Sequence, residues 1–176
     1  MKAWTLYEPW ASLVVLGEKE WETRSRPNRK IVGVRLAIHA AKKPVAEYLD
    51  DDGCFRDPHF SDALAKYDID PDMFALGCVI GFATVTSCQH VEEVRNTLTQ
   101  KQIAFGDWGD GRWCFRLQDP QMIEPVAARG YQSVWEWDME GYYPGSDPLA
   151  GCKDRKPTAY ERAVDASLLD LEYPRL

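Results

Sequence analysis

The chain has 176 residues, of which 45% are hydrophobic, and it carries a net charge of −7. This length can bury one substantial core and disfavours two domains of equal size. No apolar run approaches the roughly 18 residues of a membrane span, and no signal-peptide core follows Lys2. The five cysteines are scattered without a CxxC pair, which argues against a disulfide framework and a zinc knuckle. We therefore expect a cytoplasmic protein without membrane contact, cofactor or metal.

Positive charge gathers at the start of the chain. Residues 1–43 have a net charge of +5, whereas residues 44–176 have −12. The acidic total disfavours sequence-blind binding to long phosphate backbones, because such binding depends on many basic contacts. A local basic patch would still attract one nucleotide or a short strand, and a solvated basic loop is the alternative interpretation. The patch contains Arg24, Arg26, Arg29, Lys30, Arg35, Lys42 and Lys43.

The first elements are predicted to be a strand over 2–6, a helix over 9–16 and a second strand over 19–24. Pro9 suits the first turn of the helix, and Gly17 ends it. The helix has one apolar face, which predicts that it packs against the rest of the domain.

The second strand brings three charged groups together. Its side chains alternate between a packing face, with Trp21 and Thr23, and a charged face, with Glu22 and Arg24. Lys19 lies at the bend before the strand, where this alternation need not hold, so its amine can turn toward the charged face. We expect catalysis or ligand binding here. The structural alternative is an ion pair that only fastens the loop, and exposed pairs contribute about 0–1 kcal/mol.

Later segments favour further strands around an irregular, acidic insertion at about 42–75. The insertion is expected to contain short helices over 45–49 and 61–67, and Gly81 predicts a bulge or tight bend in the strand that follows it. The remaining expected elements are strands over 31–40, 77–88, 112–117 and 131–137, a helix over 91–98, and a C-terminal extension over 138–176 with helical spacing at 159–171.

This order of elements lacks the regular strand-helix alternation of a doubly wound sheet. It favours an α+β fold, with a small mixed β-barrel and short flanking helices, in one domain over 1–137. Because barrels of this size fill their interiors with side chains, a ligand is expected on a rim, where the helix over 9–16 crosses the barrel mouth beside residues 19–24.

Two linked motifs resemble the opening of the ASCH domain family within the PUA-like superfamily. P-W-x-S-L is followed by G-x-K-x-x-E-x-R, and later patches keep the order that this family has. The matching residues are Pro9, Trp10, Ser12 and Leu13, then Gly17, Lys19, Glu22 and Arg24, then Ile38 to Ala40, Gly77 to Gly81, Phe105 with Gly106, and Gly130 to Trp135.

The resemblance implies a PUA-like barrel with a cleft between barrel and helix that takes RNA, nucleotides or modified bases. One similar group removes the acetyl group from N4-acetylcytidine with a Lys, Thr and Glu set, and other relatives are ribonucleases. Lys19 falls on that group's lysine, but Glu22 stands where its threonine would be, and Thr23 is one residue out of register. RNA or nucleotide binding is therefore preferred. The alternatives are a hydrolase on a modified nucleoside or on RNA, and a protein-interaction module with a vestigial cleft.

The predicted site combines the charged residues with a set of binding residues. Burial near Arg24 would lower the pKa of Lys19 enough for it to act as a base, while Glu22 holds it or orients a water. Trp10 and Trp108 would stack on a base, with core packing as the alternative for each. The predicted catalytic residues are Lys19, Glu22 and Arg24, and the predicted ligand-binding residues are Pro9, Trp10, Ser12, Thr23, His39 and Trp108.

Overall fold

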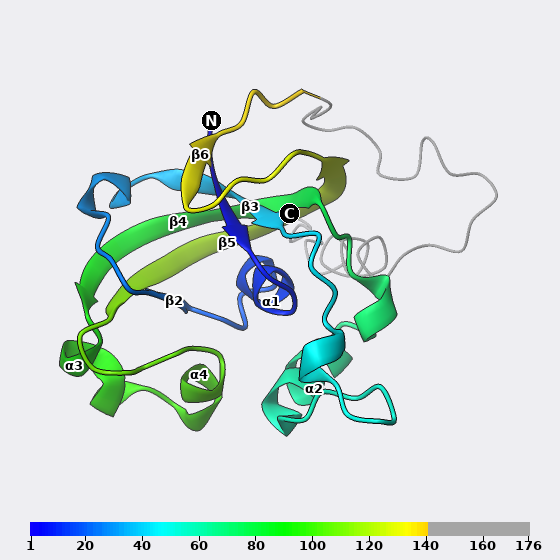
Figure 1. Cartoon of the computed structure of the whole chain (residues 1–176). Coiled ribbons are helices and arrows are strands. Elements are labelled where there is room, and N and C mark those ends of the chain that lie inside the picture. The colour runs from blue at the N-terminus through cyan, green and yellow to red at the C-terminus, as the bar shows by residue number, and fades with distance from the viewer. Residues whose placement is uncertain (141–176) are drawn as a thin grey trace, which may run out of the picture.

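The computed structural model describes residues 1–140, so the extension beyond residue 140, with the helical spacing at 159–171, lies outside the described residues. Six strands form one curled sheet in the order β2-β5-β4-β3-β1-β6 (Figure 1). Strands β1 and β3 are parallel, and the other neighbouring pairs are antiparallel. The predicted α+β class with a barrel-like sheet is confirmed. The strands are β1 (Lys2–Leu6), β2 (Trp21–Arg24), β3 (Arg35–Ala40), β4 (Cys78–His90), β5 (Trp113–Ala127) and β6 (Val134–Glu136).

The helices of the described part are all short. They are α1 (Trp10–Val15), α2 (Pro58–Ala65), α3 (Val91–Val94) and α4 (Gln100–Ala104), with single 3₁₀ turns η1 (Arg29–Ile31), η2 (Ala46–Tyr48), η3 (Pro71–Met73) and η4 (Arg95–Thr97). Within residues 1–140, none of these helices has the length and apolar character needed to cross a membrane.

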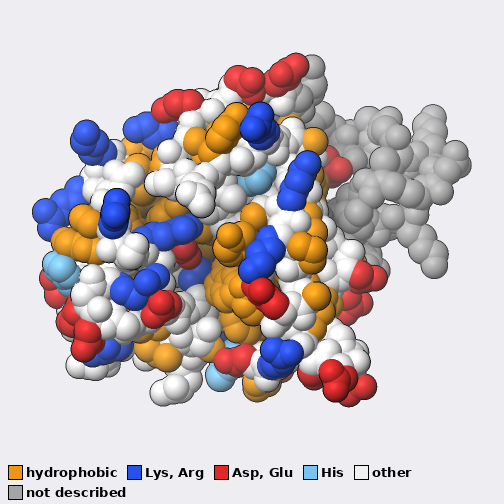
Figure 2. Space-filling model, in the orientation of Figure 1, with side chains coloured by type: hydrophobic (Ala, Val, Ile, Leu, Met, Phe, Trp, Pro, Cys, Tyr) orange, Lys and Arg blue, Asp and Glu red, His pale blue; other side chains and the backbone are white. Residues whose placement is uncertain are grey.

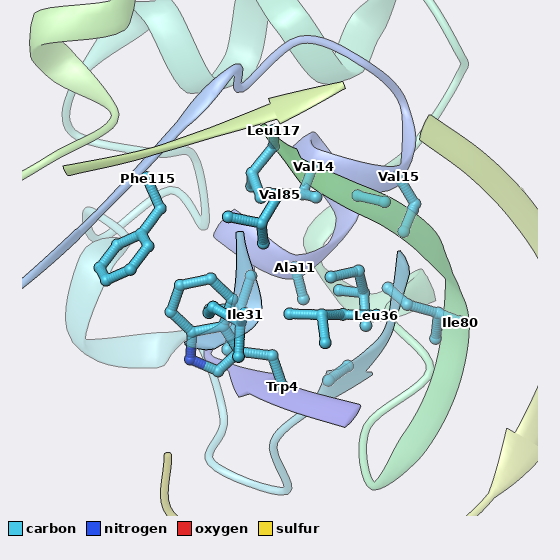
Figure 3. Close-up of a cluster of buried hydrophobic side chains, with 14 residues drawn as sticks. Trp4, Ala11, Val14, Val15, Ile31, Leu36, Ile80, Val85, Phe115 and Leu117 are labelled. Atoms are coloured by element: carbon cyan, nitrogen blue, oxygen red, sulfur yellow. The ribbon is translucent and has the colours of Figure 1, made fainter. Parts of the chain in front are cut away.

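Helix α1 lies against the curled sheet and fills its main core. A helix of this length is not stable alone in water, so its stability comes from packing, and every residue from Ala11 to Val15 is buried. The Glu8 carboxylate accepts hydrogen bonds from the Ser12 backbone N–H (3.0 Å) and hydroxyl (2.9 Å). Gly17 ends the helix at a φ of +77°, as expected. Figure 3 shows Ala11, Val14 and Val15 of α1 within the same cluster as Leu36, Ile80, Val85 and Leu117 of the sheet.

At Gly81 of β4, both α1 and β5 approach the backbone closely. The β4–β5 register shifts between Val79 and Gly81, which confirms the predicted bulge. A Cβ at Gly81 would lie closer than 3.0 Å to the Gln121 carbonyl oxygen and to the Val15 side chain. Only a residue without a side chain therefore lets the helix and two strands meet here.

Two expected strands differ clearly from the observed ones, and one observed helix has no expected counterpart. The strand expected over 31–40 begins only at Arg35, because Gly33 adopts a φ of +81° and donates its N–H to the Val85 carbonyl oxygen at 2.7 Å. Strand β5 extends ten residues past the predicted end at Leu117, through Asp119 and two prolines that bulges accommodate. Helix α4 was not predicted at all.

The acidic insertion has a small core of its own that docks on α1. Its apolar residues pack with Leu13 of α1 and with Phe105, and all of these side chains are buried. The expected short helices are η2 and α2, with bounds shifted by up to three residues. The insertion residues of this core are Val45, Phe55, Phe60, Ala63, Leu64, Ile69 and Phe74.

Candidate functional site

An open cleft of about 1930 Å³ lies between the two edges of the curled sheet. Its lining includes Glu22, Thr23 and Arg24 of the edge strand β2 and Val134 of the opposite edge strand β6. Figure 2 shows a hollow on this face with Lys and Arg side chains around it. The curled sheet forms a half-barrel whose edge strands β2 and β6 do not pair, and the cleft occupies its open side.

Lys19 lies at the floor of this cleft and is almost completely buried, with 2% of its surface exposed. Its Nζ donates a hydrogen bond to the Phe105 carbonyl oxygen at 2.5 Å and lies 3.4 Å from Oε2 of Glu22. Burial lowers the pKa of the Lys19 amine; the Glu22 carboxylate opposes this shift, and the Arg24 guanidinium adds to it. The amine thus gives up its proton more readily than an ordinary lysine.

The backbone around Lys19 is held from two sides. Its N–H donates to the Leu13 carbonyl oxygen of α1 at 2.9 Å. From α4, the buried amide of Gln102 donates to the Glu18 carbonyl oxygen (2.8 Å) and accepts from the Glu20 N–H (3.1 Å). Gln102 thereby fixes the residues before and after Lys19, so α4 sets the position of the amine.

Glu18 connects this turn to α2 and α4. Its carboxylate lies 2.8 Å from Nζ of Lys101 and 3.0 Å from Nζ of Lys66, and it accepts a hydrogen bond from the Tyr67 hydroxyl. Burial raises the pKa of Glu18, but the two ammonium groups outweigh it and the net shift is downward. This ion cluster stabilises the turn that carries Lys19.

Arg24 connects the charged group to the other side of the half-barrel. Its Nε lies 2.9 Å from Oε1 of Glu22, and its Nη2 donates to the Thr5 carbonyl oxygen of β1 at 3.2 Å. The guanidinium also lies over the Trp4 ring, 5.1 Å from its centroid. Arg24 therefore bridges β2 and β1 across the opening, which is a structural role in addition to lining the cleft.

Charge in the cleft is opposite in sign to that of the chain. Of the charged residues that line it, six are basic and two are acidic, whereas the whole chain has a net charge of −7. Glu22 pairs with Lys19 and Arg24, and Asp107 lies 3.2 Å from Arg112. The basic residues are Lys19, Arg24, Arg26, Lys42, Arg112 and Arg129.

A family model described as the ASCH domain matches residues 5–146. The chain belongs to the ASCH domain family. Among solved structures, it is similar to ASCH from Zymomonas mobilis and to two mutant forms of that protein, each at 18% identity. These alignments cover 78% of this chain and 88%, 87% and 90% of the others, with TM-scores of 0.48, 0.48 and 0.47. No curated protein matches the chain significantly. The family resemblance inferred from the sequence is confirmed.

The ASCH domain brings six of the predicted site residues to one cleft. They are Trp10, Lys19, Glu22, Thr23, Arg24 and His39. Thr23 is buried, and its hydroxyl accepts a hydrogen bond from the Asp107 N–H at 3.1 Å. Trp10 packs edge-on against Tyr48 and Phe60 in the core of the insertion, so it forms a wall of the cleft more than a free platform.

The other three predicted ligand-binding residues lie outside the cleft lining. Pro9 and Ser12 are buried, and the Ser12 hydroxyl donates a hydrogen bond to the Glu8 carboxylate. Trp108 is 7% exposed and donates its indole N–H to the Gln102 carbonyl oxygen at 3.2 Å, within a core cluster formed with Trp21, Val91 and Val94. These contacts give Ser12 and Trp108 structural roles in the ASCH domain.

His39 holds the segment that precedes β6. It is 2% exposed, and its Nε2 lies 3.1 Å from the Ala128 carbonyl oxygen, with Gly130 packed directly on its ring. Burial lowers the pKa of His39; the Ala128 carbonyl opposes this shift and Lys42 adds to it. The imidazole is therefore neutral near pH 7, and Nε2–H donates to the carbonyl.

Sequence reasoning missed four residues that shape the site. Gln102 and the Phe105 carbonyl hold Lys19, and Tyr7 and Tyr131 are exposed aromatics in the cleft lining. A signal for α4 was present, because Thr99 caps it by accepting from the Gln102 N–H, as its residue type favours. Residues 1–140 contain no group of three or more His, Cys, Asp or Glu side chains placed to hold a metal ion.

Proposed function

We propose that the cleft of this ASCH domain binds RNA or a modified nucleotide. The observation that carries the proposal is the local charge reversal, with six Lys and Arg side chains against two carboxylates in a chain of net charge −7. Phosphate groups are the anions for which such a cationic groove is suited, because clefts lined by one sign of charge raise the local concentration of opposite charge.

Three of these cations are available for a ligand. Arg26, Lys42 and Arg129 are exposed and form no ion pair with any residue of 1–140. The other three are already paired with Glu22 or Asp107. We therefore assign phosphate contacts to Arg26, Lys42 and Arg129, and the floor around Lys19 to the base or sugar.

Replacing Arg26 or Lys42 by alanine is expected to weaken RNA binding about tenfold, because a hydrogen bond to a charged group contributes about 1.5 kcal/mol or more. Each loss should also reduce the slope of log K against log salt by about 1. Fluorescence anisotropy with a labelled RNA at several salt concentrations measures both quantities.

The matched control is Arg56→Ala, which removes an exposed cation outside the cleft lining. It should leave the affinity and the salt slope unchanged. Equal losses for Arg56→Ala and Arg26→Ala would mean that RNA is attracted by charge at any place on the surface, and the cleft proposal would be wrong.

A second candidate function is hydrolysis of a modified nucleoside or of RNA, and the buried amine of Lys19 favours it. Stability alone does not explain a lysine at 2% exposure on the floor of an open cleft, since burying a charge costs free energy even when it is paired. The lowered pKa leaves a larger fraction of this amine unprotonated, and so able to accept a proton, than in an ordinary lysine.

If Lys19 is the base, the hydrolysis rate should rise with pH as the amine loses its proton and should level off above its pKa, which lies below the ordinary value of 10.5. Lys19→Met should abolish turnover of N4-acetylcytidine or a single-stranded RNA while the protein remains folded. Lys30→Met, an exposed lysine outside the cleft lining, should retain the rate and the profile. A rate that Lys19→Met leaves intact would remove this candidate.

A further inference from the structure

The exposed aromatic side chains of the described part both lie in the cleft. Tyr7 is 51% exposed and Tyr131 is 52% exposed, and both line the cleft. Every other aromatic residue of 1–140 is buried or partly buried. Val32, at 40% exposure, is the remaining large apolar residue that is exposed in 1–140, and it lies outside the cleft lining. Exposure of large rings is thus concentrated where the cationic residues are.

The two tyrosines extend from the same end of a strand pair. Tyr7 follows β1 and Tyr131 precedes β6, and these antiparallel strands place Trp4 opposite Val134. The Tyr131 ring is supported edge-on by Trp135, with 5.5 Å between centroids, and the indole of Trp135 is itself fixed by a hydrogen bond to the Thr5 hydroxyl. This platform is therefore organised before any ligand binds.

Each exposed ring has a cation beside it. Nζ of Lys43, which is also paired with the Glu47 carboxylate, lies over the Tyr7 ring at 5.2 Å from its centre. The Arg129 guanidinium lies over the Tyr131 ring at 5.4 Å from its centre. A ring next to a cation offers stacking to a base and charge to its phosphate, which is the combination that single-stranded nucleic acids require. Bases within a duplex already stack on one another and present no free face to such rings.

The size of the cleft exceeds that of a site for one nucleotide. Small-ligand sites have volumes of about 300–1,000 Å³, and this cleft has about 1930 Å³. Two stacking platforms and three available cations would also be redundant for a single base with a single phosphate.

Building on the proposed function, we propose that the ligand is a single-stranded RNA segment of several nucleotides, with one base stacked on Tyr7 and another on Tyr131. Arg26, Lys42 and Arg129 then contact the phosphates of the bound strand.

Competition binding tests this inference. A labelled, mixed-sequence RNA of about 12 nucleotides, within the range of single-strand site sizes, is displaced by unlabelled mononucleotides, by short oligomers and by a duplex. We expect competition to strengthen at least about tenfold from one nucleotide to about four, with the duplex weakest.

Tyr7→Ala and Tyr131→Ala should each weaken oligomer binding about 5- to 150-fold, which corresponds to one lost stack. Tyr→Phe at either position and Val32→Ala should stay near wild type.

The outcomes separate the two proposals. Mononucleotides that compete as well as oligomers, or oligomer binding that Tyr7→Ala and Tyr131→Ala leave intact, would overturn this inference while the nucleotide-binding function stands. Loss of binding in Tyr7→Phe as well as Tyr7→Ala would show that the hydroxyl rather than the ring face is required, and would also overturn it. Failure of the wild type to bind any of these RNAs would overturn both proposals.

Discussion

Glu22→Ala is expected to destabilise the domain by about 3–5 kcal/mol, because removing one partner of a buried ion pair leaves an uncompensated charge. The side chains of Lys19 and Glu22 are 1% and 11% exposed, so the ion pair is largely shielded from solvent. Arg24 loses the same partner, which weakens the positioning of the guanidinium that links β2 to the Thr5 carbonyl of β1. Urea unfolding at pH 7, followed by tryptophan fluorescence, measures the change.

Lys19→Met in the Glu22→Ala background is the internal control. It replaces the unpaired, buried amine with an apolar side chain of similar length, so it should restore most of the lost stability. The deficit of the single variant should also shrink as pH rises toward 10.5, the ordinary lysine pKa. Without Glu22 the folded-state pKa of Lys19 falls further, and between that value and 10.5 the unfolded chain binds more protons than the folded one. A deficit that neither the second substitution nor high pH reduces would show that Glu22 does not act through Lys19.

Gly81→Ala is expected to lower the free energy of unfolding by about 3 kcal/mol or more. The backbone segments that cross at Gly81 would have to move apart to make room for the added methyl group. The added methyl group would meet the Gln121 carbonyl oxygen and Val15 closer than 3.0 Å, and neither is the free end of a flexible side chain. Displacing α1 would also move the Leu13 carbonyl that holds Lys19, so binding should weaken together with stability.

Gly109→Ala is the matched substitution, because the nearest atom to its new methyl group is the end of the exposed Asp107 side chain, at 3.3 Å. It should change the free energy of unfolding by no more than about 0.5 kcal/mol. Thermal unfolding of both variants compares them directly, and a Gly81→Ala protein as stable as Gly109→Ala would contradict the close crossing of α1 over β4.

The local part of the site could be predicted from the sequence, and the part built by distant segments could not. Lys19, Glu22 and Arg24 lie within six positions, so strand alternation and a bend are enough to bring their charges together. The Phe105 carbonyl and Gln102 come from more than eighty residues away, through a helix that has only five residues and no apolar periodicity of its own. Contacts of that kind depend on the complete sheet topology.

Aromatic residue type was a poor guide to exposure. The sequence predicts that Trp10 and Trp108 stack on a base, but in the structure both pack in hydrophobic clusters. A large indole ring buries much apolar area, so packing it in a small core is strongly favourable. Tyr7 and Tyr131 fall where strands begin or end, at positions that no periodic pattern marks as buried or exposed. Their shared location follows from the pairing of β1 with β6, which joins segments more than 120 residues apart in the sequence.

The fold could be predicted where a glycine or the alternation of apolar and polar residues fixed the backbone, as at Gly17 and Gly81. It was not predictable where a positive φ broke an apolar pattern, as at Gly33, or where bulges let a strand continue through proline, as in β5. At Gly33 the deciding factor is a hydrogen bond to Val85, and in β5 it is the bulged pairing with β4; the local sequence shows neither.

The location of bound RNA is the most direct test of the central claim. Photo-crosslinking of an RNA that contains 4-thiouridine, followed by mass spectrometry of the linked peptides, identifies the residues in contact with the bases. We predict crosslinks to the peptides that contain Tyr7 and Tyr131, and their loss when unlabelled RNA competes. Competed crosslinks confined to the surfaces of α2 or α3, away from the cleft lining, would contradict the account.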